Sequence, residues 1–115
     1  RPRRGPRGPL RPTLTGGTPA MLYLVTMEVR IPPDADRQVV ERLQAEERQR
    51  AQELQRTGEW RHLWRVVGRY ANVSVFDVAS HRRLHEILST LPLGPYLDID
   101  VTPLTTHPSA LSADD

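Results

Sequence analysis

Residues 21–31, MLYLVTMEVRI, follow a period of two, and this pattern restricts the fold more than any other feature of the chain. Successive side chains of a β-strand point to opposite faces, so the segment predicts a half-buried strand. One face would carry Tyr23, Val25, Met27, Val29 and Ile31, and the other Leu22, Leu24, Thr26, Glu28 and Arg30. The strand therefore needs a second layer that covers one of its faces.

A helix is predicted after this strand. Two prolines at 32–33 end the strand, and either Asp34 or Asp36 is suited to cap the first turn of the helix. The helical pattern runs to about Thr57, where Gly58 is expected to stop it.

The next segment predicts a β-hairpin and a second helix. The Gly-Arg pair at 68–69 separates two strands of about 60–67 and 70–78. Ser80 is placed to cap the helix HRRLHEILSTL, whose apolar residues recur at helical spacing. They are Leu84, Ile87, Leu88 and Leu91.

A last alternating segment at 96–104, YLDIDVTPL, completes the order β-α-β-β-α-β. This order predicts an α+β, ferredoxin-like fold, in which a four-stranded antiparallel sheet carries both helices on one face. We expect Leu22, Leu24, Leu63 and Phe76 on the uncovered face. Apolar side chains there predict oligomerisation through the sheet.

Composition excludes several kinds of chemistry. All sixteen basic residues are arginine and no cysteine occurs, so lysine Schiff bases, disulfides and thiolate metal sites are excluded. No apolar run is long enough to span a membrane, and no glycine-rich phosphate loop is present. We expect a soluble, cytoplasmic protein without a cofactor, whose feasible chemistry is proton transfer by side chains.

The charge is unevenly distributed along the chain. Residues 1–20 hold five arginines, no acidic residue and many prolines and glycines, which predicts a disordered extension. The rest of the chain holds eleven arginines and fourteen acidic residues, so it does not favour nucleic-acid binding. One folded domain is expected over 21–111, followed by a short tail at 112–115.

Glu47 is the candidate catalytic residue. It falls on the same helical stripe as Val40, Leu43, Ala51 and Leu54, so a carboxylate is expected on a buried face. Burial raises the pKa of a carboxyl group and makes it a better base near neutral pH. The alternatives are a glutamate that is only tied to a hydrogen-bond donor, or one at the edge of the stripe.

The hairpin is predicted to form the opposite wall. With a turn at 68–69, Trp60, His62, Trp64 and Val66 share a face with Ala71, Val73, Val75 and Asp77, and this face would lie under the helices near Glu47. The other face would carry Arg61, Leu63, Arg65, Tyr70, Asn72, Ser74 and Phe76, and its arginines suit an anionic ligand or a partner chain. Tryptophans in such a pattern more often belong to a core than to a pocket wall, and a lone histidine such as His62 is more often hydrogen-bonded in a core than a proton carrier. The arginines could instead pair with Glu28 across the sheet.

A metal site is not predicted. His81 and His85 are one helical turn apart, but no third ligand is evident in the sequence.

Three segments of the chain resemble the muconolactone delta-isomerase family. They are AEERQRAQELQRTGEW at 45–60, WRHLWRVVGRYANVSVFDV at 60–78 and LPLGPYLDIDVTPLTTHPS at 91–109. The resemblance covers about residues 21–111. It implies a ferredoxin-like subunit in a large ring, typically a decamer, that moves a proton within muconolactone to give 3-oxoadipate enol-lactone in the β-ketoadipate route, without a metal or organic cofactor.

The resemblance also implies roles for individual residues. Glu47 corresponds to the family's helix glutamate and would be the base. Arg61 and Arg65 would hold the acetate side chain of the substrate, and the remaining pocket positions would be His62, Trp64, Tyr70 and Tyr96. Two other functions remain open, namely a dehalogenase acting on chloromuconolactones and a non-catalytic oligomeric binding module on the same fold.

Overall fold

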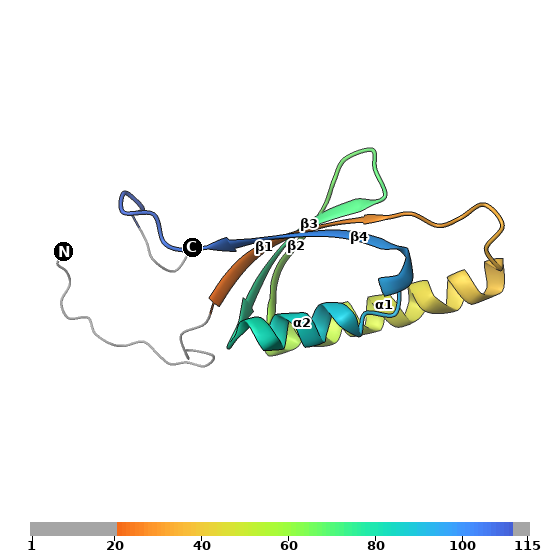
Figure 1. The fold of residues 1–115 in the computed structure, drawn as a ribbon, viewed down its shortest axis with the longest axis horizontal. Coiled ribbons are helices and arrows are strands. Elements are labelled where there is room, and N and C mark those ends of the chain that lie inside the picture. The colour runs from red at the N-terminus through yellow and green to blue at the C-terminus, as the bar shows by residue number, and fades with distance from the viewer. Residues whose placement is uncertain (1–20, 112–115) are drawn as a thin grey trace.

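The computed structural model describes residues 21–111, and the predicted extension 1–20 and tail 112–115 lie outside the described residues. Strands and helices follow one another in the predicted order (Figure 1). They are β1 (Met21–Val29), α1 (Arg37–Thr57), β2 (Trp60–Arg65), β3 (Ala71–Val78), α2 (His81–Ser89), a short 3₁₀ turn η1 (Gly94–Tyr96) and β4 (Leu97–Leu104). The four strands form one antiparallel sheet in the order β2-β3-β1-β4.

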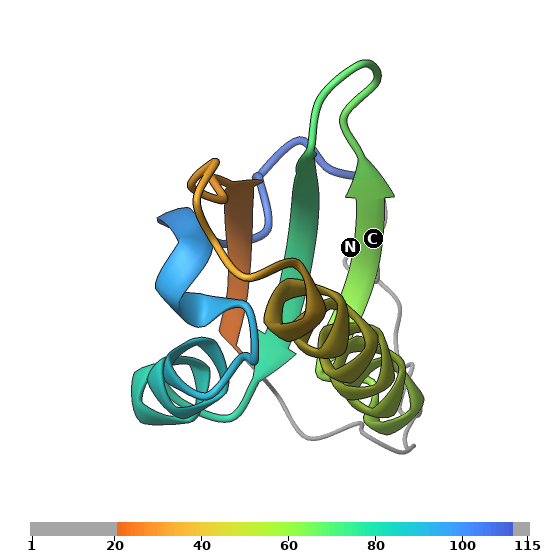
Figure 2. The ribbon, with the colours of Figure 1, turned by 90° about the vertical axis from the view of Figure 1, so that its right-hand side faces the viewer.

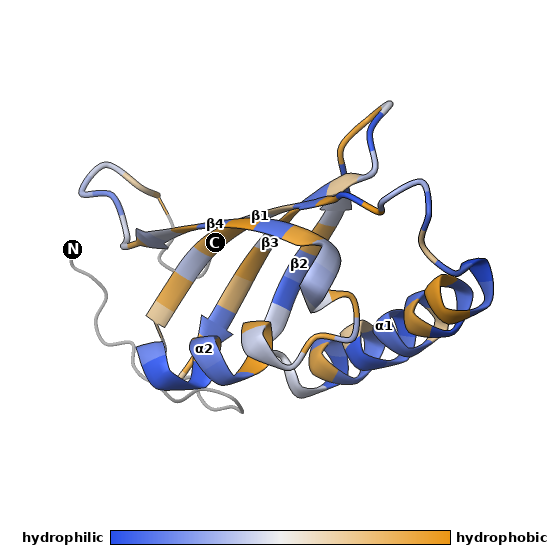
Figure 3. Cartoon of the chain, turned by 45° about the vertical axis from the view of Figure 1, so that its right-hand side comes forward, coloured by the Kyte–Doolittle hydropathy of each residue, from blue (hydrophilic) through white to orange (hydrophobic). Residues whose placement is uncertain are grey.

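Both helices lie on the same side of the sheet (Figures 1 and 2), which confirms the predicted α+β arrangement. The core fills the space between them, and it includes Tyr23, Val25 and Met27 of β1. Their neighbours Leu22 and Leu24 are half-buried and point to the helix-free side, which we call the open face. Figure 3 shows the hydrophobic positions of α1 interrupted by long hydrophilic stretches, as expected for a helix with one packed side.

Local sequence signals set the ends of the helices. The side chain of Asp36 accepts hydrogen bonds from the backbone N–H groups of Gln38 and Val39 and caps α1. Gly58 ends this helix with φ of +88°, a left-handed conformation that glycine adopts without strain. Ser80 accepts from the N–H of Arg83 at 3.0 Å and caps α2. These three caps agree with the predictions.

The hairpin departs from the predicted pattern at one residue. The predicted register is correct between His62 and Arg65, where His62 lies opposite Val75. Trp60, however, lies opposite Phe76, because a β-bulge inserts an extra residue between Trp60 and His62. An extra residue reverses the alternation of side chains on the bulged strand.

The predicted face assignment of the hairpin is therefore wrong. Phe76 and Ser74 are fully buried under the helices, and pairing with β3 puts Trp60, Leu63 and Arg65 on that same side. His62 and Trp64 lie on the open face instead, together with Val73 and Val75. Of the apolar residues predicted for the open face, Leu22 and Leu24 are there, while Leu63 and Phe76 are not.

Candidate active site

A cavity of about 750 Å³ opens between α1 and the sheet, near the ends of β2 and β3. This volume is in the range of small-molecule sites. α1 contributes one wall, with side chains three, four, seven and eight residues apart. The lining residues are Val29, Gln44, Glu47, Arg48, Ala51, Gln52, Gln55, Trp60, Leu63, Arg65, Tyr70, Ala71, Asn72, Leu93 and Leu97.

Glu47 is the only acidic side chain among the described residues that line this cavity. It is half-buried, as its place on the helical stripe predicts, and its Oε1 accepts a hydrogen bond from the backbone N–H of Leu93 at 2.9 Å. Burial raises the pKa of Glu47 above its ordinary value, and the bond from Leu93 opposes this effect only in part. The side chain is thus held in place and made more basic than an exposed glutamate.

Two arginines and a tyrosine lie around the same cavity. Arg48 follows Glu47 on α1. Arg65 lies on β2, in the wall of the cavity that faces α1. The guanidinium of Arg65 is 5.3 Å from the centre of the Tyr70 ring, a cation–π contact. The hydroxyl oxygen of Tyr70 accepts a hydrogen bond from Nε2 of Gln44 at 2.9 Å, which joins the hairpin side of the cavity to α1.

Trp60 belongs both to the core and to the cavity wall. Its indole packs against Phe76 with ring centres 4.8 Å apart. Only 2% of the residue is exposed, and among the described residues its Nε1–H is the one buried side-chain donor without a hydrogen-bond partner. A buried donor that is left unpaired is costly and calls for a physical explanation, such as an ordered water or a ligand.

Four of the predicted pocket residues do not line the cavity of this chain. His62 and Trp64 stack on each other with ring centres 4.9 Å apart on the open face, where the bulge places them. Arg61 lies at the bulge and forms an ion pair with Asp77 at 3.4 Å. Tyr96 is half-buried in η1, and its backbone carbonyl accepts a hydrogen bond from the N–H of Arg30.

Sequence reasoning missed several polar residues of the cavity. Gln44, Arg48, Gln52 and Gln55 extend the stripe of Glu47 along α1, and Asn72 adds an amide from β3. The apolar members of the stripe indicate the inward side of α1, and the polar residues beside them do not add to that apolar pattern. The spacing of the α1 residues from Glu47, which places them on the same side of the helix, is the sequence signal that could have identified them.

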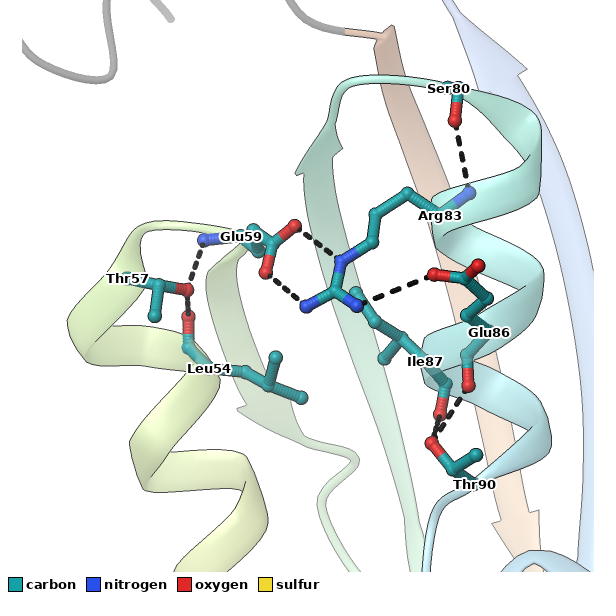
Figure 4. Close-up of polar contacts among 8 residues, drawn as sticks. All are labelled: Leu54, Thr57, Glu59, Ser80, Arg83, Glu86, Ile87 and Thr90. Carbon is teal, nitrogen blue, oxygen red and sulfur yellow. Dashed lines mark hydrogen bonds and ion pairs between the residues drawn. The ribbon is translucent and has the colours of Figure 1, made fainter.

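A polar cluster fixes the segment that leads into Trp60 (Figure 4). Both carboxylate oxygens of Glu59 accept hydrogen bonds from Arg83 of α2, each at 2.8 Å. The Arg83 guanidinium lowers the pKa of Glu59, and the hydroxyl of Thr57 donates to the carbonyl of Leu54 beside it. This bidentate pair ties α2 to the junction of α1 and β2, so it supports the end of the cavity wall.

The described residues contain neither a metal-binding cluster nor a membrane-spanning helix. Within residues 21–111, no three His, Cys, Asp or Glu side chains come close enough together to hold a metal ion. No helix in the same part of the chain has the length and apolar character needed to cross a membrane.

Comparison with known proteins identifies the family. The model of the muconolactone delta-isomerase family matches residues 21–110. The muconolactone delta-isomerase of Pseudomonas aeruginosa is 55% identical over 95 residues, which cover 83% of this chain and 99% of that protein. The enzyme of the same name from Cupriavidus pinatubonensis is 53% identical over 91 residues, or 79% of this chain and 99% of the relative.

A solved structure gives the same result. The crystal structure of a muconolactone isomerase superposes with a TM-score of 0.78 at 53% sequence identity, covering 83% of this chain and 99% of that one. The fold and the sequence agree over most of the chain. The chain therefore belongs to the muconolactone delta-isomerase family.

Proposed function

We propose that this chain is an isomerase that converts muconolactone to 3-oxoadipate enol-lactone, with Glu47 as the base. The observation that carries the proposal is a half-buried carboxyl group of raised pKa in the wall of a cavity of substrate size. Family membership supplies the substrate, because the relatives carry the name muconolactone delta-isomerase.

The reaction needs only proton transfer. The carboxylate of Glu47 removes the proton from the ring carbon that bears the acetate side chain, and the C–H electron pair becomes part of a dienolate. The carboxyl group then returns this proton to the conjugated ring carbon next to the carbonyl, on the same side of the ring. The double bond has moved, and no electron has been gained or lost overall.

The side chains around Glu47 match the requirements of this intermediate. A dienolate carries negative charge on the carbonyl oxygen of the lactone, and hydrogen-bond donors in a partly dry site stabilise such charge. Asn72 and Gln52 are donors in the cavity wall. Arg65 and Tyr70, which the family resemblance assigns to the substrate, also lie there.

The function is tested by adding muconolactone to the purified protein and following the ultraviolet change as the conjugated double bond moves. We expect a catalytic change without added metal or cofactor. If the protein releases chloride from a chlorinated muconolactone but leaves muconolactone unchanged, the dehalogenase function is correct instead. If neither compound reacts, the chain is a binding module.

We also propose that the chain acts in the cytoplasm as a homo-oligomer, with the family's decamer as the expected size. The support is the open face, where Trp64 is 55% exposed beside His62 and near the half-buried Val73 and Val75. Burial of such a surface favours association. It would also give His62 and Trp64 a structural role between subunits, in place of a role in the cavity of their own chain.

A further inference from the structure

The arginines of the described residues fall into two groups. Most of them pair with acidic side chains, and these are Arg30, Arg42, Arg50, Arg61, Arg69 and Arg83. Within residues 21–111, no ion pair is formed by Arg37, Arg48, Arg56, Arg65 or Arg82. Arg48 and Arg65 are the two members of this second group that line the cavity.

The charge of the substrate favours a cation in the wall of the cavity. In muconolactone the carboxylate is attached through one methylene to the carbon that loses its proton. Binding therefore brings the substrate's negative charge near that of Glu47, and two carboxylates so close repel each other. A cation beside the base can offset this repulsion. Arg48 is the neighbour of Glu47 on α1, and its exposed side chain is long enough to reach the cavity mouth.

Arg48 leaves the base itself available. The influences on the pKa of Glu47 are burial, which raises it, and the hydrogen bond from Leu93, which lowers it. Within residues 21–111, no ion pair joins Arg48 to Glu47, so Arg48 does not hold the base. Its charge remains free for an anionic ligand.

The other candidate arginines are less suited to act alone. Arg61 pairs with Asp77 and does not line the cavity. Arg65 lines it, but its guanidinium lies over the ring of Tyr70 and donates at 3.5 Å to the carbonyl of Arg69. Two cations on opposite walls can hold a carboxylate between them.

We propose that Arg48 binds the carboxylate of the substrate, together with Arg65 on the facing wall, and so determines specificity for acidic lactones. This inference rests on the proposed function for the identity of the substrate. It adds a specificity-determining residue on the same helix as the base.

The test compares Arg48→Gln, Arg48→Lys and the control Arg56→Gln in steady-state kinetics with muconolactone. Arg56 is an exposed arginine of the same helix that forms no ion pair with the described residues and does not line the cavity. We expect Arg48→Gln to raise KM roughly 10- to 100-fold with little change in kcat, because a charge-assisted bond to a non-reacting group is lost. Arg48→Lys should restore part of the affinity, and Arg56→Gln should match the wild type.

A second measurement separates this inference from the proposed function. Calorimetry follows the binding of the saturated lactone acid, which cannot isomerise, and of its neutral methyl ester. Arg48→Gln should weaken binding of the acid and leave the ester unaffected. Equal affinity of the wild type and Arg48→Gln for the acid overturns the inference, whether or not muconolactone reacts. If Arg48→Gln binds the acid more weakly but the wild type does not isomerise muconolactone, the role of Arg48 in carboxylate binding is supported and the proposed function is refuted.

Discussion

Replacement of Glu47 by glutamine tests the proposed base most directly. Glutamine has the same shape, and its side-chain oxygen can still accept the hydrogen bond that Leu93 N–H donates at 2.9 Å. The substitution therefore removes the proton acceptor and leaves the cavity wall in place. A positioned base raises the rate of a proton transfer about 10²–10⁴-fold. Loss of the base should therefore lower kcat by this factor, equivalent to about 2.7–5.4 kcal/mol in the activation barrier.

The pH dependence of the rate supplies a second signature of Glu47. The base is active only when ionised, and burial raises its pKa above the ordinary value of 4.5. The wild-type rate should therefore decline as the pH falls through a value above 4.5. The residual activity of Glu47→Gln should lack this decline.

Stability should change in the opposite sense from activity. A carboxyl group whose pKa is raised by folding stabilises the folded state below its unfolded pKa, and this stabilisation is lost as the pH rises through the folded pKa. At a pH above the folded pKa, the ionised and partly buried Glu47 lowers the free energy of unfolding. Glu47→Gln should therefore unfold at the same or a higher urea concentration than the wild type. At a pH well below 4.5 this difference should disappear.

Glu46→Gln is the matched control for both measurements. Glu46 is the preceding residue of α1, its side chain is 50% exposed and it pairs only loosely with Arg42, at 3.9 Å. We expect its kinetics to equal those of the wild type. If Glu47→Gln keeps more than about a tenth of the wild-type kcat, the assignment is refuted, because a positioned base is worth at least a hundredfold.

Four further predictions concern the fold and the assembly. Gly58→Ala should lower the free energy of unfolding by about 1–2 kcal/mol in urea titrations, since its φ of +88° strains any residue with a Cβ. Glu59→Gln should lower the free energy of unfolding by about 1–2 kcal/mol at pH 7, because the bidentate pair with Arg83 is lost. The difference in stability from the wild type should shrink as the pH falls through the lowered pKa of Glu59. Light scattering should give a mass many times 13.1 kDa, and Trp64→Glu on the open face should reduce it without unfolding the chain. A chain that starts at Met21 should retain full isomerase activity, because the family match and the sheet both begin there.

The features that sequence predicted correctly depend on local chemistry. Asp36, Ser80 and Gly58 fix helix ends through hydrogen bonds and backbone angles within a few residues of themselves. Glu47 was placed on the inward side of α1 because helical periodicity persists over 21 residues and needs no knowledge of the partner layer. Such signals depend little on tertiary context, and they are sufficient for the order of elements and for the inward position of Glu47.

The face of the hairpin could not be predicted in the same way. Strict alternation in β3 offers two choices, one with Val73 and Val75 inward and one with Ser74 and Phe76 inward. Counting apolar residues favours the valines, whereas the structure buries Phe76, whose ring packs on Trp60. The choice depends on a contact between two strands, which a single strand's pattern does not contain.

The bulge before His62 explains how β2 serves two surfaces. With strict alternation, Trp60 would share a face with His62 and Trp64, and Arg65 would point away from it. The extra residue lets Trp60 enter the core on the same side as Arg65, which then lines the cavity opposite Glu47. His62 and Trp64 are turned to the open face by the same step. One inserted residue thus supplies the cavity with an arginine and the open face with an aromatic pair, and neither follows from the periodicity of the strand alone.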